Sequence, residues 1–269
     1  MRLLTLSVGN TSLFGGIFSD GKLGATFRTE VGRVIPNPPL GHRTSDQPRP
    51  TRRIKDNPPY LGAVRGTIDR IVLCSVVPSL TAPLVRALRE RHGIDPAVLT
   101  TNADHGLKIG YARPQSLGTD RLAAALGAKT LFPGTHVIVV DCGTATTVTA
   151  LHRNGTLLGG AIFPGLALWP EMLAARTAQL PLADLRRPKK ALGRSTEAGI
   201  AAGIFHGHAG AIRELVTRVR REAFGRAPVI VVGTGGHAWR FKPEKIFDAL
   251  EPALVLHGLS AFAEQSSRL

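Results

Sequence analysis

Short apolar runs separated by glycine-containing turns recur along this sequence, as is typical of buried strands. They predict strands over residues 3–8, 12–18, 23–29, 70–77, 97–100, 136–140, 147–152, 157–162 and 227–232. Apolar residues three and four positions apart predict a helix over 80–91, and further helices are expected over 121–131, 166–178 and 196–222. Strands and helices mixed in this way indicate an α/β protein.

The pattern of the first half of the chain returns in the second half. Each half opens with an apolar strand, a glycine-containing turn and a β-hairpin; the turns are Ser7-Val8-Gly9-Asn10-Thr11 and Asp141-Cys142-Gly143-Thr144-Ala145. Two such halves that face each other would form a cleft, where an α/β protein can bind a ligand. We place the junction near residues 118–121, which gives domains of residues 1–118 and 119–269.

Lys and Arg outnumber Asp and Glu by 34 to 19, and the resulting net charge of +15 suits anionic partners such as nucleotides. Part of the excess lies in a Pro- and Arg-rich segment, residues 33–58, which we expect to be an exposed loop. Aromatic residues make up only 5% of the chain, so platforms for stacking bases are scarce. Nucleic acid is therefore a disfavoured partner, although the charge does not exclude it.

Both cysteines, Cys74 and Cys142, lie inside apolar runs, which favours buried thiols over a metal or redox site. No run of about twenty apolar residues occurs, so no membrane-spanning helix and no membrane partner are predicted. The first apolar run is too short for a signal peptide. These features predict a cytoplasmic protein.

The glycine-containing turns are candidate phosphate sites. Turn N–H groups and a threonine hydroxyl can bind phosphate oxygens, and glycine permits close approach because it has no Cβ. Each turn alone fits a plain hairpin equally well, but a third turn, Gly233-Thr234-Gly235-Gly236, follows another apolar run. Three such turns suggest a triphosphate held between two domains, although the sequence has no P-loop motif. The candidate nucleotide-binding residues are Ser7, Gly9, Asn10, Thr11, Gly143, Thr144 and Gly235.

Two aspartates are candidates for the chemistry. Asp141 ends an apolar strand at the expected cleft floor, where a carboxylate can bind a cation that screens phosphate charge; a turn-capping role is the alternative. Asp120 precedes a predicted helix, which is consistent with an N-cap. It is equally consistent with a general base for a substrate hydroxyl, with Arg121 binding an anionic group of the substrate.

Six short motifs, in order, resemble the type III pantothenate kinases across nearly the whole chain, residues 33–58 being the main exception. They are Gly-Asn-Thr (9–11), Leu-Gly-Thr-Asp-Arg (117–121), Asp-Cys-Gly-Thr-Ala-Thr-Thr (141–147), Gly-Gly-Ala-Ile-Phe-Pro-Gly (159–165), Gly-Arg-Ser-Thr (193–196) and Thr-Gly-Gly (234–236). The resemblance implies an α/β fold of two duplicated ribonuclease-H-like domains, of the actin type, with a central cleft. It also implies a homodimer that phosphorylates pantothenate with ATP, Mg²⁺ and a monovalent cation, K⁺ or NH₄⁺, in the first step of coenzyme A biosynthesis.

The resemblance implies roles for particular residues as well. Asp120 looks like the catalytic base, and Arg121 looks like the group that binds the substrate carboxylate. Asp141 resembles the ligand of the monovalent cation. Pantothenate contacts are implied for Tyr111, Gly118, Thr119 and Thr196, and phosphate contacts for Gly9, Asn10, Thr11 and Thr144.

One position departs from the family pattern. Ser7 stands where the family has an aspartate, two residues before the glycine of the first turn. That aspartate is expected to help hold Mg²⁺ at the phosphates, whereas serine carries no charge. One alternative is therefore an impaired relative that binds nucleotide or pantothenate and has a regulatory role, since family members have been called Bvg accessory factors. Another is a kinase of the same superfamily that acts on a different small acid or sugar.

Overall fold

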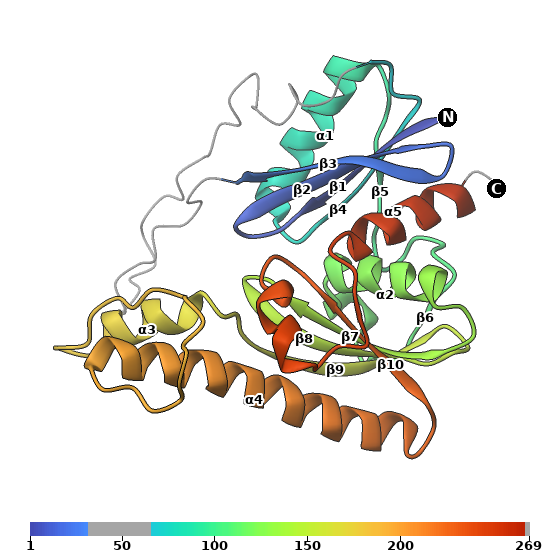
Figure 1. The fold of residues 1–269 in the computed structure, drawn as a ribbon. Helices are drawn as coiled ribbons and strands as arrows, with labels where there is room; N and C mark the ends of the chain where they lie inside the picture. The colour runs from blue at the N-terminus through green and yellow to red at the C-terminus, as the bar shows by residue number, and fades with distance from the viewer. Residues whose placement is uncertain (32–65, 267–269) are drawn as a thin grey trace.

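The computed structural model describes residues 1–31 and 66–266. These residues form two β-sheets with helices between them and on their outer faces (Figure 1). The segment expected to be an exposed basic loop, residues 33–58, lies outside the described residues.

The first sheet is built from the N-terminal hairpin and the strands that follow it. Its strands lie in the order β3-β2-β1-β4-β5. The pairs β1–β2 and β2–β3 are antiparallel, whereas β1–β4 and β4–β5 are parallel. The strands are β1 (Arg2–Val8), β2 (Ser12–Ser19), β3 (Lys22–Glu30), β4 (Arg70–Ser75) and β5 (Ala97–Val98).

The second sheet repeats this arrangement. Its strands β9-β8-β7-β10-β11 have the order and directions of β3-β2-β1-β4-β5, and β6 is added beyond β9. The identical topology confirms the repeat predicted from the sequence. The strands are β6 (Lys108–Ile109), β7 (His136–Cys142), β8 (Ala145–Leu151), β9 (Thr156–Pro164), β10 (Val229–Thr234) and β11 (Ala249–Leu250).

The helices lie on both sides of each sheet. α1 covers the outer face of the first sheet, α4 covers that of the second with α3 beside it, and α2 and α5 lie between the sheets (Figure 1). The 3₁₀-helices η2 and η3 precede α2 and follow β10. The helices are α1 (Pro78–His92), η2 (Pro114–Ser116), α2 (Thr119–Leu131), α3 (Leu168–Arg176), α4 (Thr196–Phe224), η3 (Ala238–Glu244) and α5 (Leu254–Gln265).

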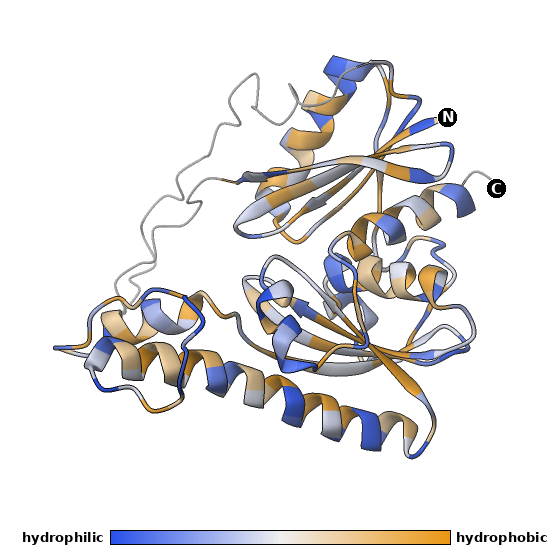
Figure 2. Ribbon diagram, viewed as in Figure 1, coloured by the Kyte–Doolittle hydropathy of each residue, from blue (hydrophilic) through white to orange (hydrophobic). Residues whose placement is uncertain are grey.

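Alternation along the strands divides the apolar side chains between the layers. In β1, Leu4 and Leu6 pack in the cluster that contains α1, whereas Leu3 belongs to the cluster between the sheets. In β7, Val140 packs with α4, whereas Val139 points to the interior between the sheets. In Figure 2, α4 has blue hydrophilic patches along its length, as expected for a helix with one face towards solvent.

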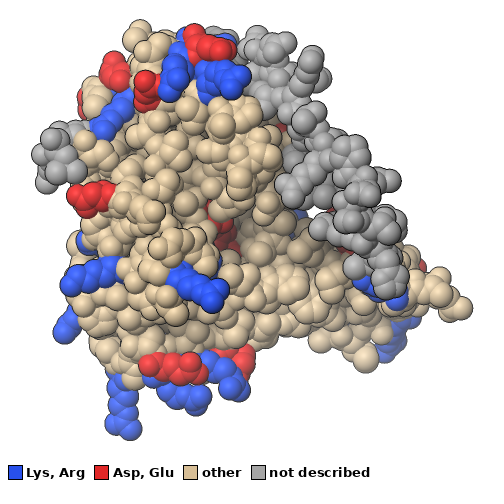
Figure 3. Space-filling model, turned by 180° about the vertical axis from the view of Figure 1, so that it is seen from behind, with Lys and Arg blue, Asp and Glu red and all other residues tan. Residues whose placement is uncertain are grey.

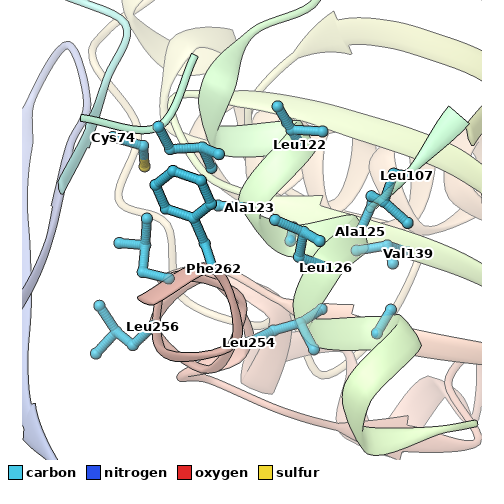
Figure 4. Close-up of a cluster of buried hydrophobic side chains, with 14 of the residues drawn as sticks. Cys74, Leu107, Leu122, Ala123, Ala125, Leu126, Val139, Leu254, Leu256 and Phe262 are labelled. Atoms are coloured by element: carbon cyan, nitrogen blue, oxygen red, sulfur yellow. The ribbon is translucent and has the colours of Figure 1, made fainter. Parts of the chain in front are cut away.

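α2 and α5, the equivalent helices of the two halves, are in close contact at two glycines. A Cβ at Gly127 would overlap the carbonyl oxygen of Leu254, and one at Gly258 would overlap that of Ala123. Figure 4 shows apolar side chains of both helices around this contact. The sequence pattern did not predict α5, whose start has no side-chain cap.

Most predicted elements are confirmed, with shifted ends. The strand predicted over 70–77 ends at Ser75, because Pro78 already begins α1. The short elements β6, β11 and η3 were not predicted. The domain boundary between residues 118 and 119 stays a prediction; β6, which precedes it in the chain, pairs with β9 of the second sheet.

Cys74 and Cys142 are buried free thiols, as predicted. Along residues 1–31 and 66–266, no helix combines the length and apolarity needed to cross a bilayer.

Candidate active site

The strands that open the two halves, β1 and β7, each carry an inward-facing polar side chain one residue before their end. Odd-numbered residues of both strands point between the sheets, so Ser7 is the last of them in β1 and Asp141 is the last in β7. Each stands two residues before the glycine of its turn, Gly9 or Gly143. The duplicated fold therefore presents the two turns to the same space.

The two turns touch each other. Thr11 Oγ1 and Thr144 Oγ1 are 2.9 Å apart and form a hydrogen bond. The N–H groups of Gly9 and Gly143 are used inside their own turns, where they donate to backbone oxygens. By contrast, no described group accepts a hydrogen bond from the backbone N–H of Asn10, Thr11 or Thr144. These N–H groups and the two hydroxyls form a set of donors that can bind phosphate oxygens.

The third glycine-containing turn lies against Asp141. Thr234 pairs with Asp141 across β10 and β7, and Gly235 follows with φ +85°. A Cβ at Gly235 would overlap Asp141 Oδ1. Glycine therefore suits this position both because it lacks a Cβ and because it readily adopts a positive φ. The N–H of His237 donates to the carbonyl oxygen of Cys142 at 3.0 Å, which fixes the loop to β7.

Asp120 lies in the first turn of α2 and is not its N-cap, so the interpretation of Asp120 as an N-cap is wrong. The N-cap is Gly118, which has no side chain. Asp120 Oδ1 accepts a 2.7 Å hydrogen bond from the N–H of Arg121, one of the unpaired donors at the start of a helix. A Cβ at Gly118 would lie 2.5 Å from Oδ1, so glycine leaves room for this carboxylate. No described residue donates to Oδ2, which can therefore accept a proton.

Arg121 and Tyr111 form a pair beside Asp120. Arg121 Nη1 donates to Tyr111 Oη at 3.1 Å, and the guanidinium lies 5.7 Å from the centroid of the tyrosine ring. The hydroxyl of Thr119 donates to the carbonyl oxygen of Ser75 at 3.0 Å, which ties the start of α2 to the end of β4. The structure thus brings together Tyr111, Gly118, Thr119, Asp120 and Arg121.

A groove of about 570 Å³ lies beside Thr119, between α1 and the end of β5. Pockets for small molecules have volumes of roughly 300–1,000 Å³, so the groove has the size of such a site. Its polar lining includes Ser75, Thr81, Arg86, Thr100 and Thr119.

Two carboxylates interact across the cleft. Burial raises the pKa of Asp141 to about 7, the negative charge of Asp120 acts in the same direction, and the positive charge of Arg28 opposes both. Burial also raises the pKa of Cys74 to about 12, with a smaller contribution from Asp120. Asp120 therefore lies near both β4 and β7. Figure 3 shows acidic side chains inside a hollow at the middle of the molecule.

Asp141 is a residue that could hold a cation. Its half-buried carboxylate accepts no hydrogen bond from a described residue and repels Asp120, so a bound cation would supply the missing counter-charge. Among the residues that the structure describes, no group of three or more His, Cys, Asp or Glu side chains could hold a metal. Mg²⁺ in kinases usually takes most of its oxygen ligands from phosphates and water. Ser7 offers only a hydroxyl, which accepts a 3.6 Å hydrogen bond from Cys74 Sγ.

Thr196 is not brought to this site within one chain. It is exposed in the first turn of α4, where Ser195 Oγ caps the helix by accepting the N–H of Ala198 at 3.1 Å. α4 covers the outer face of the second sheet, whereas α2 with Asp120 lies on the inner face (Figure 1).

Arg28 is a charged residue of the cleft that sequence reasoning did not single out. It pairs with Phe14 across β3 and β2, and Phe14 pairs with Ser7 across β2 and β1, so the three side chains face inward in one row. The alternation of side chains along residues 22–30 could have assigned Arg28 to one face of its strand. Only the strand register shows that Ser7 lies on the same face.

Two sheets of one topology, with glycine-containing turns and a carboxylate between them, define the two-domain, actin-like class of α/β proteins. Solved structures have the same fold. A Campylobacter jejuni protein whose description names the Baf family of transcriptional activators superposes with a TM-score of 0.58 at 16% identity, over 99% of this chain and 100% of that chain. The ethanolamine utilization protein EutJ of Carboxydothermus hydrogenoformans gives 0.51 at 13% identity, over 97% and 90%.

Within that class, a family model described as type III pantothenate kinase matches residues 3–218. Type III pantothenate kinases of Legionella pneumophila (strain Corby) and Moorella thermoacetica are each 35% identical, over 96% and 98% of this chain and 96% and 100% of their own lengths. A type III pantothenate kinase 1 of Francisella tularensis is 36% identical over 96% of both chains. The chain belongs to the type III pantothenate kinase family and is therefore a kinase, a transferase that uses ATP.

Proposed function

We propose that this protein transfers the γ-phosphoryl group of ATP to the terminal hydroxyl of pantothenate, which gives 4′-phosphopantothenate and ADP in the first step of coenzyme A biosynthesis. The observation that carries the proposal is the position of Asp120. Its Oδ1 is fixed by the N–H of Arg121, its Oδ2 has no donor among the described residues, and its charge acts on both sheets.

The chemistry assigns one step to each part of the cleft. Asp120 Oδ2 accepts the proton of the substrate hydroxyl, and that oxygen forms a bond to the γ-phosphorus as the bond between the γ-phosphorus and the bridging oxygen of ADP breaks. The N–H groups of Asn10, Thr11 and Thr144 bind phosphate oxygens. Phosphoryl transfer depends mostly on positioning and charge neutralisation, which a donor set on two rigid turns can supply.

Pantothenate carries a carboxylate, and Arg121 is the proposed group that binds it. Its hydrogen bond to Tyr111 orients the guanidinium beside Asp120, and Arg–carboxylate pairs are strong when bidentate. Gly118 and Thr119 complete this side of the substrate site, and the neighbouring groove has enough volume for a small polar molecule.

Two cations complete the proposed site. A bound Mg²⁺ ion would supply positive charge at the phosphates, and Ser7 would bond one of its water ligands. K⁺ or NH₄⁺ would be held at Asp141, whose carboxylate has no donor among the described residues and lies near Asp120. Gly235 leaves the space that the Asp141 carboxylate needs, whereas a Cβ at Gly143 would only make an ordinary contact with it.

We further propose a cytoplasmic homodimer in which Thr196 of one chain closes the substrate site of the other. Thr196 is exposed and lies on the far side of the second sheet from Asp120 of its own chain. One large apolar side chain near this region, Met172 on α3, is 49% exposed and would be covered in a dimer. The interpretation as an impaired relative gains no support from the assembled Asp120, Arg121 and Tyr111.

The direct test is ATP-dependent phosphorylation of pantothenate by the purified protein, with Mg²⁺ and with or without K⁺. We expect product, and we expect Asp141→Asn to remove the dependence on K⁺ while leaving ATP binding intact. Absence of product with pantothenate, but turnover with another small hydroxy acid, would contradict the assigned substrate.

The shared site can be tested by mixing two inactive variants, Asp120→Asn and Thr196→Glu. In a randomly mixed dimer population, half of the dimers carry one chain of each kind, and one of their two sites has both native residues. About a quarter of the wild-type activity should then return. If the mixture stays inactive while both variants dimerise, the two residues do not belong to one shared site.

A further inference from the structure

The inward faces of the two sheets differ in charge along one row of residues. In the first sheet the row runs Cys74, Ser7, Phe14, Arg28 across β4, β1, β2 and β3, and Arg28 is its only charged member. In the second sheet the corresponding row is Thr234, Asp141, Thr147, Ile162. The first half therefore brings a cation to the cleft, and the second half brings an anion.

Two contacts hold the Arg28 guanidinium at the first turn. It lies 4.3 Å from the centroid of the Phe14 ring, and Nη1 donates to Ser12 Oγ at 3.0 Å. Stacking on a ring and one hydrogen bond fix the plane of a guanidinium and so orient its remaining donors. Ser12 follows Thr11, whose hydroxyl meets that of Thr144, so the guanidinium lies beside the junction of both turns.

Arg28 also acts electrically on the opposite side of the cleft. Its charge opposes the rise in the pKa of Asp141 that burial and Asp120 cause, and it makes a smaller contribution to lowering the pKa of His237, which follows the third turn. A triphosphate between the turns would meet two carboxylates, Asp120 and Asp141, and would be repelled without nearby positive charge. Arg121 is paired with Tyr111 at the substrate side, so it does not serve this purpose.

We propose that Arg28 is a phosphate-binding residue whose guanidinium contacts the β- and γ-phosphate oxygens of ATP between the two turns. The proposal rests on the proposed function only in so far as this cleft holds ATP, and it does not depend on the phosphoryl acceptor. In this proposal Arg28 supplies the charged phosphate contact of the first half, where Ser7 carries no charge. A planar guanidinium can bind two phosphate oxygens at once, which an ammonium cannot.

The test compares Arg28→Met and Arg28→Lys with the matched control Lys22→Met, which removes a cation from the other end of the same strand, β3. Calorimetry measures binding of ATP, ADP and AMP in Mg²⁺ buffer without pantothenate. We expect Arg28→Met to weaken ATP binding roughly 10- to 100-fold, as for a lost hydrogen bond to a charged group, and to change AMP binding less than threefold. Arg28→Lys should give an intermediate loss, and Lys22→Met should match the wild type.

Binding of ATP by Arg28→Met within threefold of the wild type would overturn the proposal. Equal losses for ATP and AMP would also overturn it, because they indicate a structural effect. If Arg28→Met fails to fold, Arg28→Lys replaces it. The binding of ATP, ADP and AMP to Arg28→Lys is then compared with binding to the wild type, with the positive charge kept. Failure of the proposed function looks different: the wild type would not phosphorylate pantothenate, yet ATP binding would still depend on Arg28.

Discussion

The two halves of this protein share one backbone plan but use it for opposite charges. The last inward-facing residue of β1 and of β7 stands two positions before a glycine, yet that residue is Ser7 in the first half and Asp141 in the second. Two strands away, Arg28 in the first half corresponds to Ile162 in the second. The donor turns thus persist in both halves, because backbone N–H groups do not depend on side-chain identity, whereas the charges around them differ.

The helices between the sheets likewise share a backbone arrangement and differ in charge. α2 and α5 occupy equivalent places and pack on each other through glycines, but only α2 carries an acidic residue in its first turn. The repeated architecture supplies the cleft, and single side chains on one copy supply the proposed chemistry.

The largest expected effect comes from making the start of α2 as neutral as that of α5. Asp120→Asn should lower the turnover number by roughly 10²–10⁴-fold, the contribution of a well-placed general base. ATP binding should stay near the wild-type value, because the phosphate donors lie on other elements. Steady-state kinetics and calorimetry measure the two quantities. Glu264→Gln on α5 is the matched control and should leave turnover unchanged; turnover of Asp120→Asn within tenfold of the wild type would refute the base assignment.

The second prediction concerns α4, which has no counterpart among the described residues of the first half. His208 on α4 is 1% exposed and its Nε2 lies 3.0 Å from Thr146 Oγ1. Burial, with a smaller effect of His237, lowers its pKa to about 4 from the ordinary 6.5. The unfolded chain therefore takes up the proton first as the pH falls. The contribution of His208 to stability should be constant above about pH 6.5, fall by up to about 3 kcal/mol towards pH 4, and level off below it, whereas the raised pKa of Asp141 acts in the opposite direction between about pH 4 and 7.

Urea unfolding at several pH values measures this dependence. Other buried histidines contribute as well, so the informative quantity is the difference between the wild type and His208→Gln. That variant should lose part of the decline between pH 6.5 and 4. An unchanged slope in the variant would show that His208 does not titrate on unfolding.

The third prediction tests the contact between the equivalent helices. Gly258→Ala would push a Cβ into the carbonyl oxygen of Ala123, and overpacking of this kind costs about 1–3 kcal/mol of unfolding free energy. The matched control is Gly210→Ala on the exposed side of α4, where a Cβ meets nothing within 4 Å. Since alanine is the better helix former, the control should gain about 0.5–1 kcal/mol. Equal urea midpoints for the two variants would contradict the close contact.

The smallest expected effect comes from making the first turn resemble the second. Ser7→Asp adds a carboxylate at the position that corresponds to Asp141, so it should bind Mg²⁺ better and raise kcat/KM several-fold at limiting Mg²⁺. Activity titrated against Mg²⁺ measures this, with Ser19→Asp at the far end of β2 as the control. A wild type that is already fast, with no gain in Ser7→Asp, would mean that another group holds the metal.

Much of the site follows from local patterns in the sequence. The turns at 9–11, 143–145 and 234–236 were identified because glycine after an apolar run marks a strand end, and Asp120 because it precedes a helix. The exact role of Asp120 in α2 was not predictable, since the N-cap is Gly118 and a glycine cap carries no side-chain signal. α5 was also not predicted; a missing cap does not explain this, because α1, α2 and α3 lack a capping side chain as well and were predicted.

The sequence by itself determined the α/β class, the internal repeat, the three turns and the family, because these depend on residue types at short spacing. Only the tertiary structure decided which of these residues meet. Strand register puts Arg28, Phe14 and Ser7 in one row, the stacking of the two sheets brings Thr11 to Thr144, and the layer order keeps Thr196 away from Asp120. Such contacts join residues far apart in the chain, so they depend on packing that no local pattern encodes.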